Sequence, residues 1–412
     1  MLEMKRLYFI LLIFIILSGI VWSDNQDYYF NFSDIFSGLE DPNTGLTIFP
    51  TLLIPMGGRY EGMGTAFTAV SDDSGFIESN PAGSAVLENG ELAFLHHSWI
   101  ADSNMEGIIW TMRLRNLGLG AAAKFLYVPF TEYNDWGERS SKGIISETIA
   151  TFNISYNFFS SYKFHGLSLG ANIKFAYRHI PRSIYEDQSA ATAMIDLGLL
   201  TRFNFLKAFN SSKENFSIGI AFKNFGFPAK DEPLPTMLST GIAYSPVRPL
   251  LISVDFNLPI SFNNEERPAE RWYIASGFDI TITNFLGIQG GFQIKENPRL
   301  SLGATVDLTK VNFVLNYNLD LSGRLNPLDK FSIAARINLG DKGRAALAEE
   351  VQQLYADGLE AYANGDYFQA LDLWEHAIEL DPGFLPAIEI LTTTLERLQL
   401  QDEIVARQQL DS

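Results

Sequence analysis

Residues 167–178 read LSLGANIKFAYR, and this stretch sets the class of fold that the sequence predicts. The odd-numbered positions, from Leu167 to Tyr177, are apolar or aromatic, whereas the even-numbered positions, from Ser168 to Arg178, carry small, polar or basic side chains. Successive side chains of a strand point to opposite faces. The stretch therefore predicts a β-strand with one apolar and one polar face.

The same alternation recurs from Glu91 to Leu339 and predicts a β fold of fourteen antiparallel strands, with twelve or sixteen as alternative counts. Most of these strands run for about 10 to 12 residues, enough to cross a bilayer when tilted, whereas sandwich strands are usually nearer five or six. The predicted strands are 91–100, 105–114, 117–128, 146–157, 166–178, 191–204, 215–225, 236–245, 249–257, 270–282, 285–294, 299–308, 311–320 and 329–338.

The connections favour a closed barrel over a soluble sandwich. Thr283-Asn284 is a short connection, whereas Pro129–Lys142 and Leu258–Pro268 are long and polar. Short turns at one end and long external loops at the other are typical of outer-membrane barrels. A closed barrel also pairs every backbone amide without water, which lipid requires. We therefore expect a transmembrane outer-membrane β-barrel over residues 91–340, with both of its ends on the periplasmic side.

The N-terminus has the order of a secretory signal. Lys5-Arg6 precede an apolar run from Leu7 to Ile20, and Val21-Trp22-Ser23 follows at the expected cleavage region. The run is shorter than the ~20 residues that a membrane-spanning helix needs. We expect residues 1–23 to be a signal peptide and residues 24–90 to form an N-terminal segment and a plug.

The plug is predicted from a glycine-rich stretch, Gly57 to Val70, that is followed by Asn80-Pro81-Ala82-Gly83. It has too many glycines for a stable helix and too few branched residues for a free strand. Because it stands between an export signal and a barrel, we expect a compact plug at the barrel entrance.

The last 72 residues change period and charge. Residues 341–412 contain 15 acidic and 4 basic residues, a net charge of −11 out of −18 for the chain. Helical periodicity continues through residues that fit the 34-residue tetratricopeptide pattern, namely Gly358, Tyr362, Tyr367, Ala370, Trp374, Ala377 and Pro382. We expect periplasmic helices that either bind a partner through Tyr362, Tyr367 and Trp374 or only cap the barrel.

Composition and motifs argue against an enzyme. The chain has no cysteine. Its net charge is negative, whereas a protein that binds nucleic acid presents a basic surface. Asp72, Asp73 and Glu78 have the oxygen ligands of a Ca²⁺ site, but acidic turn residues are the preferred interpretation. We expect no catalytic residue, cofactor or metal. Basic residues on the polar face either contact an anionic head group or pair with carboxylates; they are Lys124, Lys174, Arg178, Lys223 and Arg336.

Residues 50–340 resemble the FadL-type outer-membrane transporter superfamily, most specifically at Gly62-Met63-Gly64, at Ser71-Asp72-Asp73 and at Asn80-Pro81-Ala82-Gly83. Within it, the chain is similar to the PorV/PorQ-like branch and to an uncharacterised spirochaete-type barrel family. The resemblance implies fourteen strands around an N-terminal hatch that moves to let hydrophobic ligands leave sideways through the wall. Asn80, Pro81 and Ala82 would form the hatch turn. Its permissive backbone would come from Gly57, Gly58, Gly62 and Gly64.

Two functions follow from the resemblance. The first is transport of long-chain fatty acids or similar hydrophobic molecules across the outer membrane through a hatch-gated barrel. The alternative is a PorV/PorQ-like scaffold or shuttle of a secretion or envelope-assembly system, with a periplasmic or envelope protein bound by residues 341–412.

Overall fold

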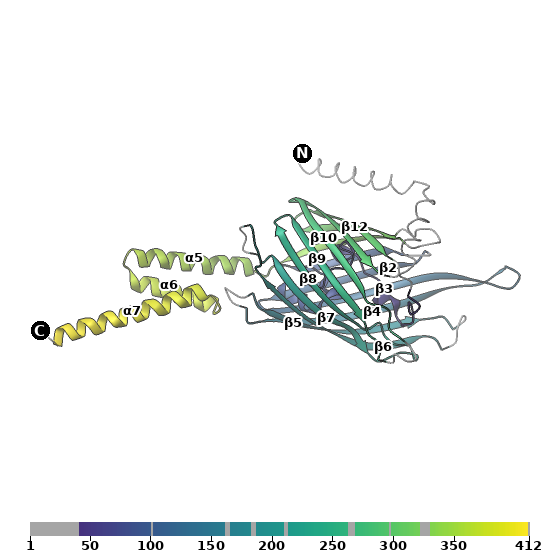
Figure 1. The fold of residues 1–412 in the computed structure, drawn as a ribbon, viewed down its shortest axis with the longest axis horizontal. Coiled ribbons are helices and arrows are strands. Elements are labelled where there is room, and N and C mark those ends of the chain that lie inside the picture. The colour runs from purple at the N-terminus through teal and green to yellow at the C-terminus, as the bar shows by residue number, and fades with distance from the viewer. Residues whose placement is uncertain are drawn as a thin grey trace.

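The structure is a computed structural model that describes residues 41–99, 102–160, 165–182, 187–209, 213–262, 268–295, 298–321 and 330–410. The predicted signal peptide, residues 1–23, lies outside these described residues. Fourteen described strands form one closed antiparallel barrel, in which sequence neighbours pair and β1 closes the ring against β14. Figure 1 shows the barrel from the side. The predicted fold class is confirmed.

The strands match the alternating stretches of the sequence. They are β1 (Gly90–Ser98), β2 (Asn104–Leu114), β3 (Leu117–Tyr133), β4 (Arg139–Phe158), β5 (Leu167–His179), β6 (Ala190–Phe203), β7 (Phe216–Gly226), β8 (Met237–Val247), β9 (Leu250–Pro259), β10 (Tyr273–Thr283), β11 (Leu286–Ile294), β12 (Arg299–Asp307), β13 (Val311–Asp320) and β14 (Lys330–Gly340).

One predicted loop is wrong. The segment 129–142 is mostly strand, because β3 and β4 continue as a hairpin that projects beyond the other strands (Figure 1). Asn134 closes this hairpin by accepting hydrogen bonds from the amides of Trp136 and Glu138 at 3.0 and 2.8 Å. The polar residues of the segment suggested a loop, but cross-strand pairing extends the ladder to Tyr133 and Arg139.

The two faces of the wall have opposite polarity. On β5, the outward-facing Leu169, Ile173 and Phe175 are 43 to 52% exposed, whereas the inward-facing Ser168 and Asn172 are at most 1% exposed. Large exposed apolar side chains recur around the outside of the barrel. An apolar exterior of this extent matches hydrocarbon rather than water. The barrel is therefore a membrane-spanning one.

The two ends of the barrel differ. We call the end from which β1 starts and at which β14 finishes the helix end, and the opposite end the loop end. The short connections 115–116, 248–249, 284–285 and 308–310 all lie at the helix end. The predicted alternation of loop lengths is only partial, because the longer connection 204–215 lies at this end too.

Residues 48–87 fill the lumen, and we call them the hatch. Four short helical turns carry it: η2 (Pro50–Leu52), α3 (Gly58–Gly62), α4 (Phe76–Ser79) and η3 (Pro81–Val86). The glycine-rich stretch was expected to form no stable helix, and it forms this five-residue turn, α3. The wall supplies the partners that such a short helix needs.

Three helices follow β14 and project away from the helix end (Figure 1). They are α5 (Arg344–Ala363), α6 (Tyr367–Leu380) and α7 (Leu385–Leu410), and we call them the tail. Among the helices that the structure describes, none has the length and hydropathy of a membrane-spanning helix. The tail has its own core around Trp374, Ala370, Ala377 and Phe384.

Candidate functional site: a plugged lumen with a cavity on each side

The hatch fits closely because glycines stand where its backbone meets the wall. A Cβ placed on any of five lumen-facing wall glycines would overlap hatch atoms, so no larger residue fits there. The wall residues are Gly118, Gly170, Gly198, Gly219 and Gly291, and they face Ser84, Pro81, Asn80, Thr68 and Gly64 respectively.

Polar side chains of the lumen satisfy the irregular backbone of the hatch. Asp255 Oδ2 accepts hydrogen bonds from the Phe67 and Thr68 amides at 2.9 and 2.8 Å. Asn316 Nδ2 donates to the Gly58 carbonyl at 2.9 Å. Non-helical backbone inside a membrane-spanning protein must find such partners, because each unpaired group costs several kcal/mol. The polar inner face is therefore largely a seat for the hatch.

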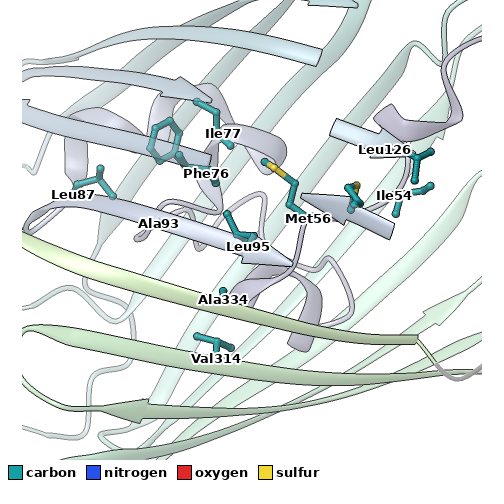
Figure 2. Packing of buried hydrophobic residues seen from close by; sticks show 12 residues of the cluster. Ile54, Met56, Phe76, Ile77, Leu87, Ala93, Leu95, Leu126, Val314 and Ala334 are labelled. Atoms are coloured by element: carbon teal, nitrogen blue, oxygen red, sulfur yellow. The ribbon is translucent and has the colours of Figure 1, made fainter. Parts of the chain in front are cut away.

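Apolar packing completes the seal on the side of β1, β2 and β14. Figure 2 shows Phe76 and Ile77 of the hatch near Leu95 of β1, within one cluster of buried residues. Phe76 is fully buried and Ile77 is 2% exposed. Each side chain of this kind contributes about 1.5–3 kcal/mol when buried. The hatch is thus a folded part of the barrel interior.

The predicted hatch turn is the N-cap of η3. Asn80 is fully buried, and its Oδ1 accepts from the Ala82 amide at 3.1 Å. Its Nδ2 donates at 2.9 Å to the carbonyls of Thr68 in the hatch and Leu199 in the wall. Pro81 occupies the first turn, where a missing amide costs nothing. Asn80 therefore joins two hatch segments to β6.

The predicted hatch glycines lie beside this seat. Gly57, Gly58 and Gly64 have φ angles of 130°, 71° and 61°, which side chains with a Cβ rarely adopt. Gly62 lies where a Cβ would come within 2.7 Å of Asn316 Oδ1. All four positions thus need glycine for backbone geometry or close approach; their part in movement stays a prediction.

An ion-pair cluster closes the hatch toward the helix end. Arg59 of α3 lies 2.7 Å from both Asp72 and Asp279, and 3.2 Å from Asp73. Arg336 of β14 reaches the same Asp73 at 2.6 Å. Burial of Asp73 opposes the charge of its carboxylate, but the opposite charges beside it prevail. Arg336 and Arg59 hold the pKa of the Asp73 carboxyl below its ordinary value.

A cavity of ≈ 270 Å³ lies between the hatch and the connections of the loop end. Its walls combine apolar side chains such as Leu52, Met56 and Met237 with six basic residues, namely Lys124, Lys174, Lys223, Lys295, Arg299 and Lys330. The volume is close to the ~300 Å³ at the low end of ligand pockets. We call it the loop-end cavity.

Lys223 differs from the other lumen cations singled out in the sequence. Lys124 pairs with Glu78 at 2.8 Å, and Lys174 pairs with Asp196 at 2.6 Å. Arg178 and Arg336 pair with Glu147 and Asp73, at 2.6 Å each. Lys223 is 6% exposed, and within the part of the chain that the structure describes no hydrogen-bonding or ion-pairing partner lies at its ammonium group.

These ion pairs also account for the carboxylates that could have held Ca²⁺. Asp72 and Asp73 pair with arginine, and Glu78 pairs with Lys124 and accepts from the Met56 amide at 2.8 Å. Over the described ranges, no group of three or more carboxylate or histidine side chains is arranged to hold a metal ion.

A second cavity, of ≈ 610 Å³, lies on the other side of the hatch, and we call it the helix-end vestibule. It is lined by charged residues of both signs, including Arg59 and Asp73 of the hatch and Arg202 of β6. The hatch therefore separates two cavities, and both have charged residues of both signs in their walls.

The three predicted partner-binding residues of the tail have different positions. Trp374 is fully buried, and its indole donates to the Tyr355 carbonyl at 3.3 Å, so it stabilises the tail rather than facing a partner. Tyr362 packs between Trp374 and Tyr367, with ring centroids 5.9 and 5.2 Å away. Tyr367 is 40% exposed and remains accessible.

Fold and lumen together define a membrane-spanning β-barrel that is plugged by its own N-terminal region. This is the 14-strand, hatch-filled architecture that the FadL-type resemblance implied; the PorV/PorQ-like branch and the tetratricopeptide assignment stay predictions. The chain belongs to an uncharacterised protein family, UPF0164, whose model matches residues 36–342.

Relatives of the same family occur in Treponema pallidum (strain Nichols). One UPF0164 protein is 30% identical over 386 residues, covering 89% of this chain and 87% of the relative. Another is 26% identical over 391 residues, covering 86% and 76%. Among solved structures, the Pseudomonas putida toluene transporter TodX has 11% identity and a TM-score of 0.45, covering 70% of this chain and all of that one. The KdgM porin has 9% identity and a TM-score of 0.31, covering 60% and 99%.

Reasoning from the sequence missed Arg59, Asp279 and the wall glycines. The glycines were detectable, because Gly118, Gly170 and Gly198 stand at inward positions of alternating strands where polar residues otherwise prevail. The Arg59–Asp279 pair joins residues 220 positions apart and leaves no local signal.

Proposed function

We propose that this protein binds hydrophobic molecules with an anionic head group, such as long-chain fatty acids, and transports them across the outer membrane. The loop-end cavity is the binding site, and the hatch is the gate below it. The loop end faces the outside of the cell, and the helix end, with the tail, faces the periplasm.

The observation that carries the proposal is Lys223, the one cation of the loop-end cavity wall without a carboxylate partner among the described residues. A buried ammonium group without a partner is costly, whereas a carboxylate at hydrogen-bonding distance compensates it. Leu52, Met56 and Met237 would surround the hydrocarbon chain. Such an arrangement selects a molecule with one anionic end and one apolar end.

Displacement of a fluorescent long-chain fatty acid from the purified protein in detergent tests this proposal. Lys223→Met removes the charge and keeps an unbranched side chain. A hydrogen bond to a charged group contributes ~1.5–3 kcal/mol, so we expect the acid to bind about 10- to 100-fold more weakly. The fatty alcohol of the same chain length is the matched control, and Lys223→Met should leave its binding unchanged. Equal loss for acid and alcohol, or no loss, contradicts the proposal.

A second function is favoured by the tail. Its helices carry most of the net charge of the chain, and Arg344 anchors their base to the hatch by donating to the Leu87 carbonyl at 3.1 Å and to the Glu88 carbonyl. Beyond that base the helices project away from the barrel (Figure 1). A scaffold or shuttle role would use this acidic surface, including Tyr367, to bind a periplasmic or envelope protein. A protein without residues 341–412 should then no longer retain this partner in a pull-down, whereas it should still bind the fatty acid.

A further inference from the structure

A small void, which we call the slot, lies in the hatch between the two cavities. Its volume is only ≈ 10 Å³, and its lining includes Met56 and Glu78, which also line the loop-end cavity, and Arg59 and Asp73, which also line the helix-end vestibule. A cavity needs ~10–15 Å³ to hold one water molecule. In this conformation the slot therefore passes nothing larger than water.

The wall beside the slot is closed. Leu95 and Ala334 border the slot from β1 and β14, and they lie near Met56 in Figure 2. The β1–β2 ladder is uninterrupted from Glu91 to Ser98, and the β1–β14 ladder is uninterrupted over the same residues of β1. A continuous ladder leaves no sideways opening at this place.

The charged cluster stands at the helix-end side of the slot. Arg59 joins Asp72 and Asp73, which follow the glycine-rich stretch, to Asp279 on the wall. Arg59 and Asp73 both line the slot; Arg59 ties this part of the hatch to Asp279, and Arg336 of β14, which also lines the slot, pairs with Asp73 from the wall. Opening the slot requires these pairs to separate, whereas the polar seat of η3 on β5 and β6 can stay intact.

From this geometry, and resting on the proposed transport function, we propose that passage through this barrel is axial, through the slot, and that Arg59 is the latch that keeps the slot closed. Ligand released from the loop-end cavity moves past Met56 and enters the helix-end vestibule. The latch acts on hatch residues 57–75, and η3 stays seated.

The test uses the absence of cysteine from the chain. Ala334→Cys places one thiol in the slot at a fully buried position. The protein is reconstituted in liposomes, and a water-soluble, membrane-impermeant thiol reagent is added. The thiol should react slowly with Arg59 present and about 100-fold faster with Arg59→Gln, because breaking a buried ion pair shifts such an equilibrium by that order. Single-channel conductance in planar bilayers should rise in parallel.

Arg178→Gln is the matched control. The Arg178 side chain also faces inward and is 19% exposed, against 15% for Arg59. It pairs with Glu147, which accepts a hydrogen bond from the amide of Thr51 at the start of the hatch. It does not border the slot. Its loss should leave thiol reaction and conductance at the level of the unmutated hatch. If Arg178→Gln opens the slot equally, or Arg59→Gln leaves it closed, the latch is overturned.

Asp279→Asn provides a second variant should Arg59→Gln fail to fold. It removes one of three carboxylates from Arg59 and should give a smaller increase in thiol reaction; no increase contradicts the latch. Displacement of the fluorescent fatty acid is measured on the same samples. Absence of fatty-acid binding would refute the proposed function, whereas the rate of thiol reaction would still show whether Arg59 keeps the slot closed. Failure of the proposed function and failure of the latch are therefore distinguishable.

Discussion

Gly291 of β11 offers the sharpest test of how the hatch is seated, because the same strand carries its own control. A Cβ at Gly291 would come within 2.5 Å of Gly64 Cα and closer still to Gly64 N. This is roughly 0.9 Å short of ordinary contact at 3.4 Å. Gly287 faces the lumen four positions earlier, and there the nearest atom to a Cβ is the flexible Gln289 amide at 3.4 Å.

The expected cost follows from the contact. Overpacking a well-fitted interior costs ~1–3 kcal/mol, and here backbone meets backbone, so neither partner can rotate away. We expect the upper half of this range, about 2–3 kcal/mol, for Gly291→Ala and almost none for Gly287→Ala. The seated hatch would then open about 30- to 150-fold more often.

Hydrogen exchange of the purified protein measures this opening directly. The amides of Met63 and Gly64 donate to the carbonyls of Arg59 and Glu61 at 2.9 Å each, so they are protected only while α3 is intact. Gly291→Ala should accelerate their exchange, and Gly287→Ala should not. Equal exchange in the two variants would show that the close approach of hatch and wall does not hold α3 in place.

Three further predictions concern the hatch and the tail. Asn80→Ala removes three hydrogen bonds and leaves buried carbonyls unpaired, so η3 should lose about 3 kcal/mol and exchange its amides faster, with Thr392→Ala on the tail surface as the unaffected control. The pKa of Asp73 is lowered, so the stabilisation that its carboxylate contributes is present above the ordinary aspartate pKa, about 4. This stabilisation is lost as pH falls through the lowered pKa. Acid should therefore destabilise the hatch of the unmutated protein more than the hatch of Asp73→Asn, and thermal unfolding between pH 7 and 3 measures the difference. Trp374→Ala should cost the tail about 3–5 kcal/mol and melt its helices by circular dichroism, while the barrel keeps its heat-modifiable gel migration; loss of the barrel as well would mean that the tail is needed for its assembly.

The barrel could be predicted because its signal is local and repeated. Alternation at LSLGANIKFAYR and at the other strands is imposed by lipid on one side and the lumen on the other, so each strand reports its own two faces. The hairpin of β3 and β4 was missed because its outer part projects beyond the other strands, and polar residues such as Glu132 are common there although the backbone is paired.

The hatch was placed by its position and glycine content, but its contacts could not be derived. Asn80 meets Leu199, and Arg59 meets Asp279, only after the barrel has closed. The polar inner face also had two interpretations, ligand contact or internal pairing. The structure shows internal pairing for Lys124, Lys174, Arg178 and Arg336, whereas Lys223 has no partner within the described chain and its contact with a ligand stays a prediction.

The most direct measurement is an experimental structure of the purified protein with a bromine-labelled long-chain fatty acid. We expect the carboxylate within hydrogen-bonding distance of Lys223 Nζ and the bromine beside the apolar side chains of the loop-end cavity, such as Leu52 and Met237. Fatty acid found only on the outer wall, or a loop-end cavity without ligand at saturating concentration, would contradict the proposed transport function.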